Sequence, residues 1–121
     1  MTPSEIAYAA ADYMAEHGHC KYMLWNDEGN VCLLGALMKV TDASLLFFNA
    51  TTAGAEIFDT LTAILIRRGE SPCGSLPVIW NNDPCTTAED AILLLKEAGV
   101  ELAGQETARD AFHARLAKSG A

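Results

Sequence analysis

Apolar residues recur every three or four positions near the start of the chain, which is the spacing of one face of a helix. Thr2, Pro3 and Glu5 precede this pattern and form a helix start, with a cap, a first-turn proline and an acid three residues after the cap. Gly18 is suited to end the helix, because glycine adopts left-handed backbone conformations without steric cost. The sequence therefore predicts an amphipathic helix from Pro3 to His17.

The middle of the chain carries two further helix patterns. A run that is apolar on all sides predicts a short buried helix over 32–40. A longer amphipathic pattern predicts a helix that Thr51 or Thr52 caps and Gly69 ends. Beside these helices we expect a short turn over 44–48 and a loop over 70–76.

The last third of the chain predicts a short extended segment over 77–80, packed on the core, and then two helices. Thr86 and Thr87 each have an acid three residues later, which marks a helix start, and Gly99 is expected to end that helix. A final helix is predicted over 105–118.

Between the first two predicted helices, residues 21–25 are rich in strand-forming side chains and 26–29 have the composition of a turn. Residues 30–32 can return as a second strand. The expected register places Trp25 opposite Asn30. The sequence thus predicts a mainly α, α+β fold: four main helices and one or two short ones around a single core, with a small β-hairpin near 21–32, in one domain over 1–121.

Composition limits the compartment and the partners. Half of the 121 residues are hydrophobic, but no apolar run reaches the ~18 residues that a membrane-spanning helix needs. The chain starts without the basic and then apolar pattern of a signal peptide. We therefore expect a cytoplasmic protein that does not bind membranes; self-association is left open.

The formal net charge of −8 argues against binding to nucleic acid, because an acidic surface repels phosphates. Mimicry of DNA by the acidic surface is the alternative. The acids are dispersed along the chain, and many of them stand at predicted helix starts, so mimicry is the weaker interpretation.

The cysteines have three interpretations. Structural zinc sites usually pair cysteines two to four residues apart, whereas this chain has no C-x-x-C pair. We therefore expect buried free thiols and neither metal nor another cofactor. Disulfides and a zinc site are the alternatives; the four cysteines are Cys20, Cys32, Cys73 and Cys85, and the zinc ligands would be His17, His19, Cys20 and Cys32.

Cys32 is the best candidate for a catalytic nucleophile. It stands at a predicted helix start, where the helix dipole lowers the pKa of a thiol, and His17 and His19 are near it in sequence. Asn81, Asn82 or Asp83 would orient the base. The alternative, which we favour, is an inert buried thiol flanked by apolar residues, and the chain contains none of the phosphate-binding or hydrolase motifs.

Both tryptophans stand before an asparagine and a polar turn. We interpret them mainly as structural residues, because tryptophan usually packs its ring in a core and donates its N–H. If the two turns lie side by side, two helix N-termini create a weakly positive pocket for a small anion or an acidic peptide. That predicted binding site consists of Trp25, Asn26, Asn30, Trp80, Asn81, Asn82 and Thr86. The alternative is that these groups only satisfy their own turns.

Two motifs resemble those of a family of small uncharacterised proteins from actinobacteria and their bacteriophages. The first is the stretch His17-Gly18-His19-Cys20-Lys21 followed by Gly29-x-Val31-Cys32-x-x-Gly35-Ala36. The second is the Trp80-Asn81-Asn82-Asp83 turn before a threonine-capped helix. The chain departs from the family pattern at His19, where tryptophan is expected, and at Tyr22, where glycine is expected.

The resemblance implies no catalytic residue, but it implies a phage or actinobacterial source and, for a small phage protein, a role in binding a host or phage protein. We therefore expect a non-enzymatic protein-binding function. A small hydrolase or transferase that uses Cys32 is the alternative.

Overall fold

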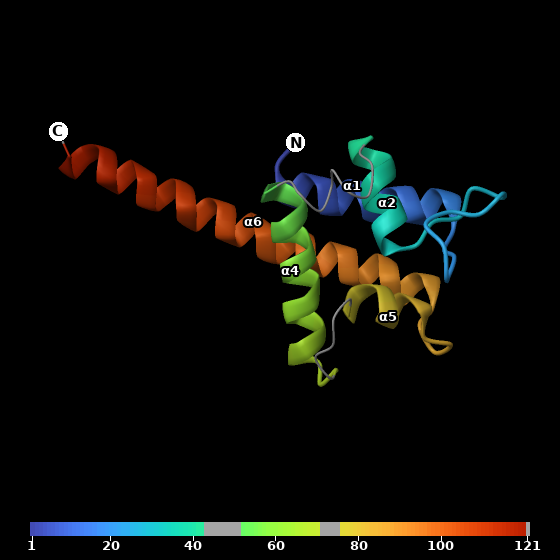
Figure 1. Cartoon of the computed structure of the whole chain (residues 1–121). Coiled ribbons are helices and arrows are strands. Elements are labelled where there is room, and N and C mark those ends of the chain that lie inside the picture. Colours follow the sequence, from blue (N-terminus) through green and yellow to red (C-terminus); the bar gives the residue numbers. More distant parts are fainter. Residues whose placement is uncertain (43–51, 71–75, 121) are drawn as a thin grey trace.

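A computed structural model describes residues 1–42, 52–70 and 76–120 of the chain. Within these ranges the fold consists of helices joined by turns (Figure 1). The helices are α1 (Pro3–His17), α2 (Leu33–Thr41), α4 (Thr52–Arg67), α5 (Leu76–Asn82) and α6 (Ala88–Ser119). None of them is long and apolar enough to cross a membrane.

The core lies where α1, α2 and α4 meet the first half of α6. α1 makes its most extensive contacts with α6, and α2 packs on α1. Gly99 permits close packing of α1 on α6, because a Cβ atom at Gly99 would lie 2.8 Å from the ring of Tyr8. The second half of α6 leaves the core and projects away from the other helices (Figure 1). Its residues 107–120 are all exposed.

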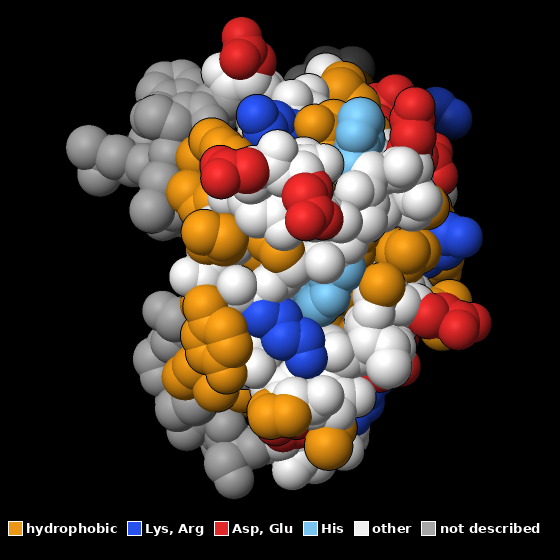
Figure 2. All heavy atoms as spheres, turned by 90° about the vertical axis from the view of Figure 1, so that its right-hand side faces the viewer, with side chains coloured by type: hydrophobic (Ala, Val, Ile, Leu, Met, Phe, Trp, Pro, Cys, Tyr) orange, Lys and Arg blue, Asp and Glu red, His pale blue; other side chains and the backbone are white. Residues whose placement is uncertain are grey.

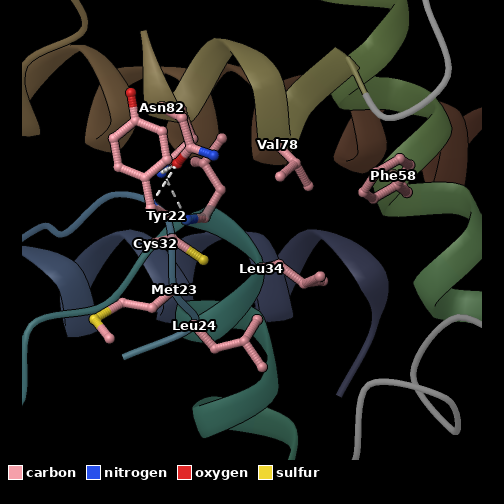
Figure 3. Close-up of a pocket in the computed structure, with 10 residues that line it drawn as sticks. Tyr22, Met23, Leu24, Cys32, Leu34, Phe58, Val78 and Asn82 are labelled. Carbon is pink, nitrogen blue, oxygen red and sulfur yellow. Dashed lines mark hydrogen bonds between the residues drawn. The ribbon is translucent and has the colours of Figure 1, made fainter. Parts of the chain in front are cut away.

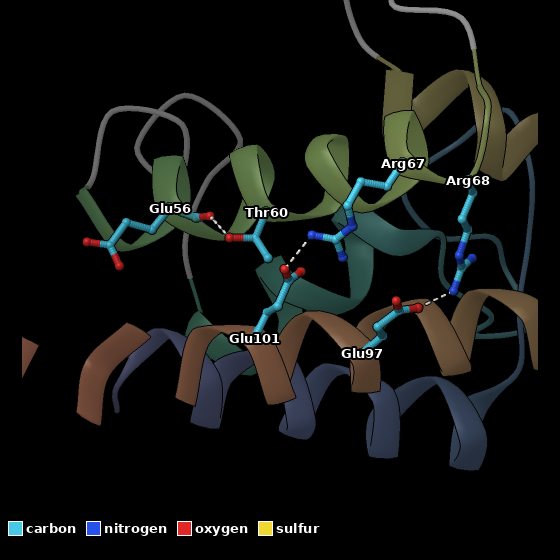
Figure 4. A network of polar contacts seen from close by, with 6 residues as sticks. All are labelled: Glu56, Thr60, Arg67, Arg68, Glu97 and Glu101. Atoms are coloured by element: carbon cyan, nitrogen blue, oxygen red, sulfur yellow. Dashed lines mark hydrogen bonds and ion pairs between the residues drawn. The ribbon is translucent and has the colours of Figure 1, made fainter. Parts of the chain in front are cut away.

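Ion pairs join α4 to α6 at the surface (Figure 4). Arg67 Nη1 lies 2.6 Å from Glu101 Oε1, and Arg68 pairs with Glu97. Arg109, farther along α6, reaches Glu56 near the start of α4 at 3.5 Å. Exposed pairs of this kind contribute about 1 kcal/mol or less each, so the apolar contacts of the core are the main force that holds α4 in place.

The predicted helix from Pro3 to His17 is confirmed with the same bounds, and the mainly α architecture is confirmed. Thr2 and Glu5 form the expected capping box at the start of the helix. At its end Gly18 adopts φ +95°, and its N–H donates to the Met14 carbonyl. The helices predicted over 32–40 and from Thr52 onward are also present. The predicted turn over 44–48, the cap candidate Thr51, and Cys73 lie outside the described residues. Thr52, the other cap candidate, is the first residue of α4.

The α+β assignment and the hairpin near 21–32 are wrong. The described residues form no sheet there, only isolated bridges from Val31 to His19 and to Trp25. Trp25 therefore lies opposite Val31 and not opposite Asn30. Tyr22 interrupts the first predicted strand, because it adopts the left-handed conformation with φ +66° and donates its N–H to a side chain on α5.

Two predictions in the last third are also wrong. Residues 77–80 belong to helix α5 and are not extended. The two helices predicted around Gly99 are one continuous helix, α6. Gly99 does not end it, since this glycine is the contact point for Tyr8.

Candidate functional site

The side chain of Asn81, at the end of α5, joins three separate parts of the chain. Its Oδ1 accepts the Leu33 N–H at 3.1 Å and lies 2.7 Å from Nε2 of His19. Its Nδ2 donates to the Cys20 carbonyl at 3.1 Å and to Asn82 Oδ1 at 3.2 Å. Asn81 is 1% exposed, and these four bonds use the full hydrogen-bonding capacity of its amide.

The partners of Asn81 also determine that Nε2 of His19 is the donor in the bond between them. The Leu33 N–H can only donate and the Cys20 carbonyl can only accept, so the amide has one permitted orientation. Oδ1 therefore faces His19, and Nε2 of His19 carries the hydrogen that it donates.

Asn82 continues the link between α5 and the turn region, which is the segment 18–32 between α1 and α2. Its Oδ1 accepts the Tyr22 N–H at 2.7 Å. Lys21 also bonds through its ammonium group to the carbonyl of Asp83. Together Asn81 and Asn82 tie the second tryptophan–asparagine segment to the turn that follows α1.

The turn after α5 is closed by its own polar groups. Thr86 Oγ1 donates to the Trp80 carbonyl at 2.7 Å, and the Cys85 N–H bonds to Asp83 Oδ1 at 2.8 Å. Thr87 then caps α6 and forms a capping box with Asp90. Thr86 thus orients the end of α5, whose last residue is Asn82.

The first tryptophan–asparagine turn is closed in the same way. Asn26 Oδ1 accepts the N–H groups of Glu28 and Asn30, at 3.1 and 3.0 Å. The Asn30 amide donates to the His17 carbonyl at the end of α1. In this structure Asn26, Asn30 and Thr86 therefore bond within or next to their own turns, whereas Asn81 and Asn82 bond across the fold.

The two tryptophans have different environments. Trp25 is 40% exposed, and the ammonium group of Lys39 lies 4.1 Å from its ring centroid, within the range of a cation–π contact. Trp80 is half-buried against the core.

In the stretch from Gly29 to Ala36, each residue that carries the resemblance has a structural role. Gly29 adopts φ +87°, and Val31 is fully buried between its two bridge partners. Cys32 caps α2 by accepting the Gly35 N–H at its Sγ. A Cβ atom at Gly35 would lie 1.9 Å from the Leu24 carbonyl oxygen, so only glycine permits this approach. Ala36 is fully buried.

The surroundings of Cys32 do not activate its thiol. Cys32 is 8% exposed, and burial raises its pKa, which opposes formation of the thiolate nucleophile. Burial and the neighbouring Cys32 also raise the pKa of Cys20. Neither His17 nor His19 is engaged as its base: the ring of His17 stacks on Tyr13, and His19 bonds to Asn81.

Among the described residues no group of three or more His, Cys, Asp or Glu side chains has an arrangement that holds a metal. Cys20 Sγ instead donates to the carbonyls of Met23 and Asn30. Cys20, Cys32 and Cys85 are free thiols, and Cys85 is exposed.

A pocket of about 360 Å³ lies between the turn region, the start of α2, α4 and α5 (Figure 3). Most of its wall is apolar, and polar groups are confined to the end where α5 finishes. Its lining residues are Tyr22, Met23, Leu24, Cys32, Leu33, Leu34, Phe58, Val78, Asn81 and Asn82. Asn81 and Asn82 are thus the members of the sequence-predicted binding set that the structure places in the pocket wall.

The rim of the pocket exposes apolar side chains. Tyr22 is 78% exposed and Met23 is 53% exposed. Figure 2 shows hydrophobic side chains gathered along one side of this end of the molecule, whereas acidic side chains are scattered over it. At the pocket itself, the exposed lining residues Tyr22 and Met23 are apolar and not acidic.

Sequence reasoning missed the apolar half of the pocket. Phe58 and Val78 come from helices that are distant in sequence, and no local pattern shows that they face one cavity. For Tyr22 a signal was present, since the resemblance described above led us to expect glycine at this position, and glycine is the residue suited to its left-handed conformation.

Comparison with curated proteins and with solved structures gave no match. Residues 1–101 match DUF6197, a family of unknown function. The match includes the turn region, α2, α4, α5 and the first half of α6, which together contain the whole pocket. This chain therefore belongs to the DUF6197 family of unknown function.

Proposed function

We propose that this protein is a non-enzymatic binding protein, and that it recognises a partner protein by accepting an apolar side chain of the partner in the pocket. The observation that carries the proposal is the apolar pocket itself, whose rim exposes Tyr22 and Met23. Exposed apolar surface around a concave site is typical of protein-interaction sites.

The chemistry of the pocket wall supports binding over catalysis. Cys32 is the nucleophilic side chain in the wall, and burial raises its pKa. Its Sγ already accepts the Gly35 N–H as the cap of α2. The structural role of Cys32 thus accounts for its presence without a reaction.

The family resemblance supports the finer part of the proposal. It implies an actinobacterial or phage source, and we propose that the partner is a host or phage protein met in the cytoplasm. The net charge of −8 disfavours nucleic acid as the partner.

A pair of adjacent substitutions on α5 tests the use of the pocket. Val78 lines the pocket, whereas Ile79, the next residue, is 54% exposed and is not part of the wall. Val78→Phe fills the cavity, and Ile79→Phe adds the same ring outside it. Peptides selected from a random library on the wild-type protein are then titrated against both variants by fluorescence polarisation.

We expect Val78→Phe to weaken binding at least about tenfold, because about 1.4 kcal/mol of contacts is lost, and Ile79→Phe to change affinity less than about threefold. Thermal unfolding of both variants checks that the fold is intact. Selected peptides that bind Val78→Phe as tightly as wild type would show that the pocket is not the site. A selection that yields no binder would count against the binding function.

A further inference from the structure

The polar end of the pocket contains an amide donor that the fold does not use. Asn82 accepts two hydrogen bonds at Oδ1, from Tyr22 N–H and from Asn81 Nδ2. Its own Nδ2 has no recorded partner among the described residues. Figure 3 shows this nitrogen on the side of the pocket where Val78 lies.

The other polar side chains in the wall are occupied or point elsewhere. The Asn81 amide makes four bonds, and Cys32 Sγ caps α2. The Tyr22 hydroxyl belongs to a side chain that is 78% exposed, and it points away from Val78 in Figure 3. Asn82 Nδ2 is therefore the side-chain donor best placed to contact a group inside the pocket.

The charge around this donor selects between two kinds of acceptor. No Lys, Arg or His is among the described residues that line the pocket, and the whole chain carries a net charge of −8. A carboxylate entering the apolar pocket would lose its hydration without gaining a cation, which is costly. A neutral carbonyl oxygen accepts the same N–H bond without that cost.

The volume limits the size of the ligand. A pocket of about 360 Å³ is at the small end of the range of about 300–1,000 Å³ seen for ligand sites. It suits one branched or aromatic side chain together with an adjacent carbonyl group, and it is too small for a large cofactor.

We propose that the pocket recognises an apolar residue inside a peptide segment, with the apolar side chain filling the cavity and Asn82 Nδ2 donating to a neutral backbone carbonyl of that segment. This inference rests on the proposed protein-binding function and names the chemistry that the partner presents. It excludes a free carboxyl terminus or a fatty acid as the preferred ligand.

A matched pair of small molecules tests the choice of acceptor. The probes 3-methylbutanamide and 3-methylbutanoate share one branched apolar group and differ in the charge of the acceptor. Both are titrated into ¹⁵N-labelled full-length protein, and the side-chain amide signals of Asn82 are followed by NMR. We expect the amide to bind at least about fivefold more tightly, within the range of one hydrogen bond, and to shift the Asn82 NH₂ signals.

Asn82→Asp tests the donor itself. This substitution keeps an oxygen that accepts the Tyr22 N–H and replaces Nδ2 with an oxygen that cannot donate. We expect binding of the amide probe and of the selected peptides to weaken about fivefold or more, while Ile79→Phe leaves both unchanged. If Asn82→Asp loses its fold, the comparison of the two probes on the wild-type protein remains the test.

Failure of this inference is distinguishable from failure of the proposed function. Peptides that Val78→Phe blocks but Asn82→Asp leaves unaffected would overturn the role of Asn82 and retain the binding pocket. Tighter binding of the carboxylate probe than of the amide probe would overturn the neutral acceptor. Peptides whose affinity neither variant changes would overturn both proposals.

Discussion

Tyr22 holds a strained backbone conformation at the mouth of the pocket. With φ +66° it occupies the left-handed region, which costs a residue with a side chain about 1–2 kcal/mol. Its side chain is 78% exposed, so little packing offsets that cost. Asn82 holds Tyr22 in this conformation through the bond to its N–H.

We therefore predict that Tyr22→Gly raises the free energy of unfolding by about 0.5–1 kcal/mol, since glycine relieves the strain but adds entropy to the unfolded chain. Urea denaturation of the two proteins measures the difference. A loss of stability would mean that the Tyr22 ring makes contacts that outweigh the strain. In the binding assays the same variant shows whether the exposed ring contributes to affinity.

Two helical glycines give opposite predictions for the same substitution. At Gly35 an added Cβ would lie 1.9 Å from the Leu24 carbonyl oxygen, whereas at Gly104 no atom lies within 4 Å. We predict that Gly35→Ala destabilises the fold by about 2 kcal/mol or more, because backbone must move. Gly104→Ala should stabilise it by about 0.5–1 kcal/mol through helix propensity.

Thermal unfolding followed by circular dichroism tests both glycine variants side by side. Equal effects of the two substitutions would contradict the close approach of Leu24 to α2. The Gly35 position also shows what sequence alone can give at the residue scale. The Gly29–Ala36 motif was visible, but its reason, a carbonyl from the preceding turn, appears only in the folded chain.

At the scale of helices, the bounds set by signals within a segment were predicted correctly. The bounds set by contacts between distant segments were not. α1 has its cap, first-turn proline and terminal glycine within the segment itself, and its predicted bounds are those observed. Gly99 carries the same kind of terminal signal, yet the helix continues through it because Tyr8 of α1 packs there. For α5, a seven-residue helix that ends in two asparagines, the apolar run is too short for periodicity to separate helix from strand.

The capping boxes of α1 and α6 predict how stability responds to acid. Hydrogen bonds from the Thr2 backbone and side chain lower the pKa of Glu5 below its usual 4.5, and those of Thr87 lower the pKa of Asp90 below its usual 3.8. A carboxylate whose pKa is lowered by folding contributes stability above its usual pKa. That contribution is lost as the pH falls through the folded value.

We therefore expect the free energy of unfolding to decrease as the pH falls below about 4.5. The double variant Glu5→Gln/Asp90→Asn should be less stable at pH 7 and should lose less stability over the same pH range. Urea denaturation between pH 3 and pH 7 measures both. An unchanged pH dependence in the double variant would contradict the contribution of the two boxes.

At the scale of the whole molecule, α6 belongs to two environments. Leu102 is fully buried, whereas residues 107–120 are all exposed and lie beyond the region that matches the family. We predict that a chain ending after Glu106 has a melting temperature within about 2 °C of that of the full chain. Such a chain keeps the hydrogen bonds between Glu106 and Ser4. The fold owes little to exposed surface residues.

The comparison variant for this truncation is Leu102→Ala, which removes one buried side chain from the same helix. Leu102→Ala should lower the free energy of unfolding by about 2–5 kcal/mol, although it deletes far fewer atoms than the truncation does. Thermal unfolding of the two proteins, followed by circular dichroism, makes the comparison. A large loss on truncation would show that contacts of the removed segment, such as the Arg109–Glu56 ion pair, contribute more stability than an exposed pair usually does.

The candidate site could be predicted only in part, for the same reason as the fold. Asn81 and Asn82 stood out because they come directly after Trp80 and precede a turn. Their bonds to the turn region span 48 to 62 positions in sequence, and no local pattern encodes a partner at that distance. The apolar wall from Phe58 and Val78 was missed for the same reason.

The bonds from Asn81 and Asn82 also allow opening of the pocket to be followed by amide hydrogen exchange. The amide protons of Leu33 and Tyr22 are both held by side chains at the end of α5. If α5 detaches as a unit, both protons become free to exchange in the same opening event. We expect the two amides to report the same opening free energy, and a ligand in the pocket to slow both together. Unequal slowing would show that one asparagine can release its partner while the other stays bound. The exchange rates of these two protons thus report the equilibrium between the closed pocket and the state in which α5 is detached.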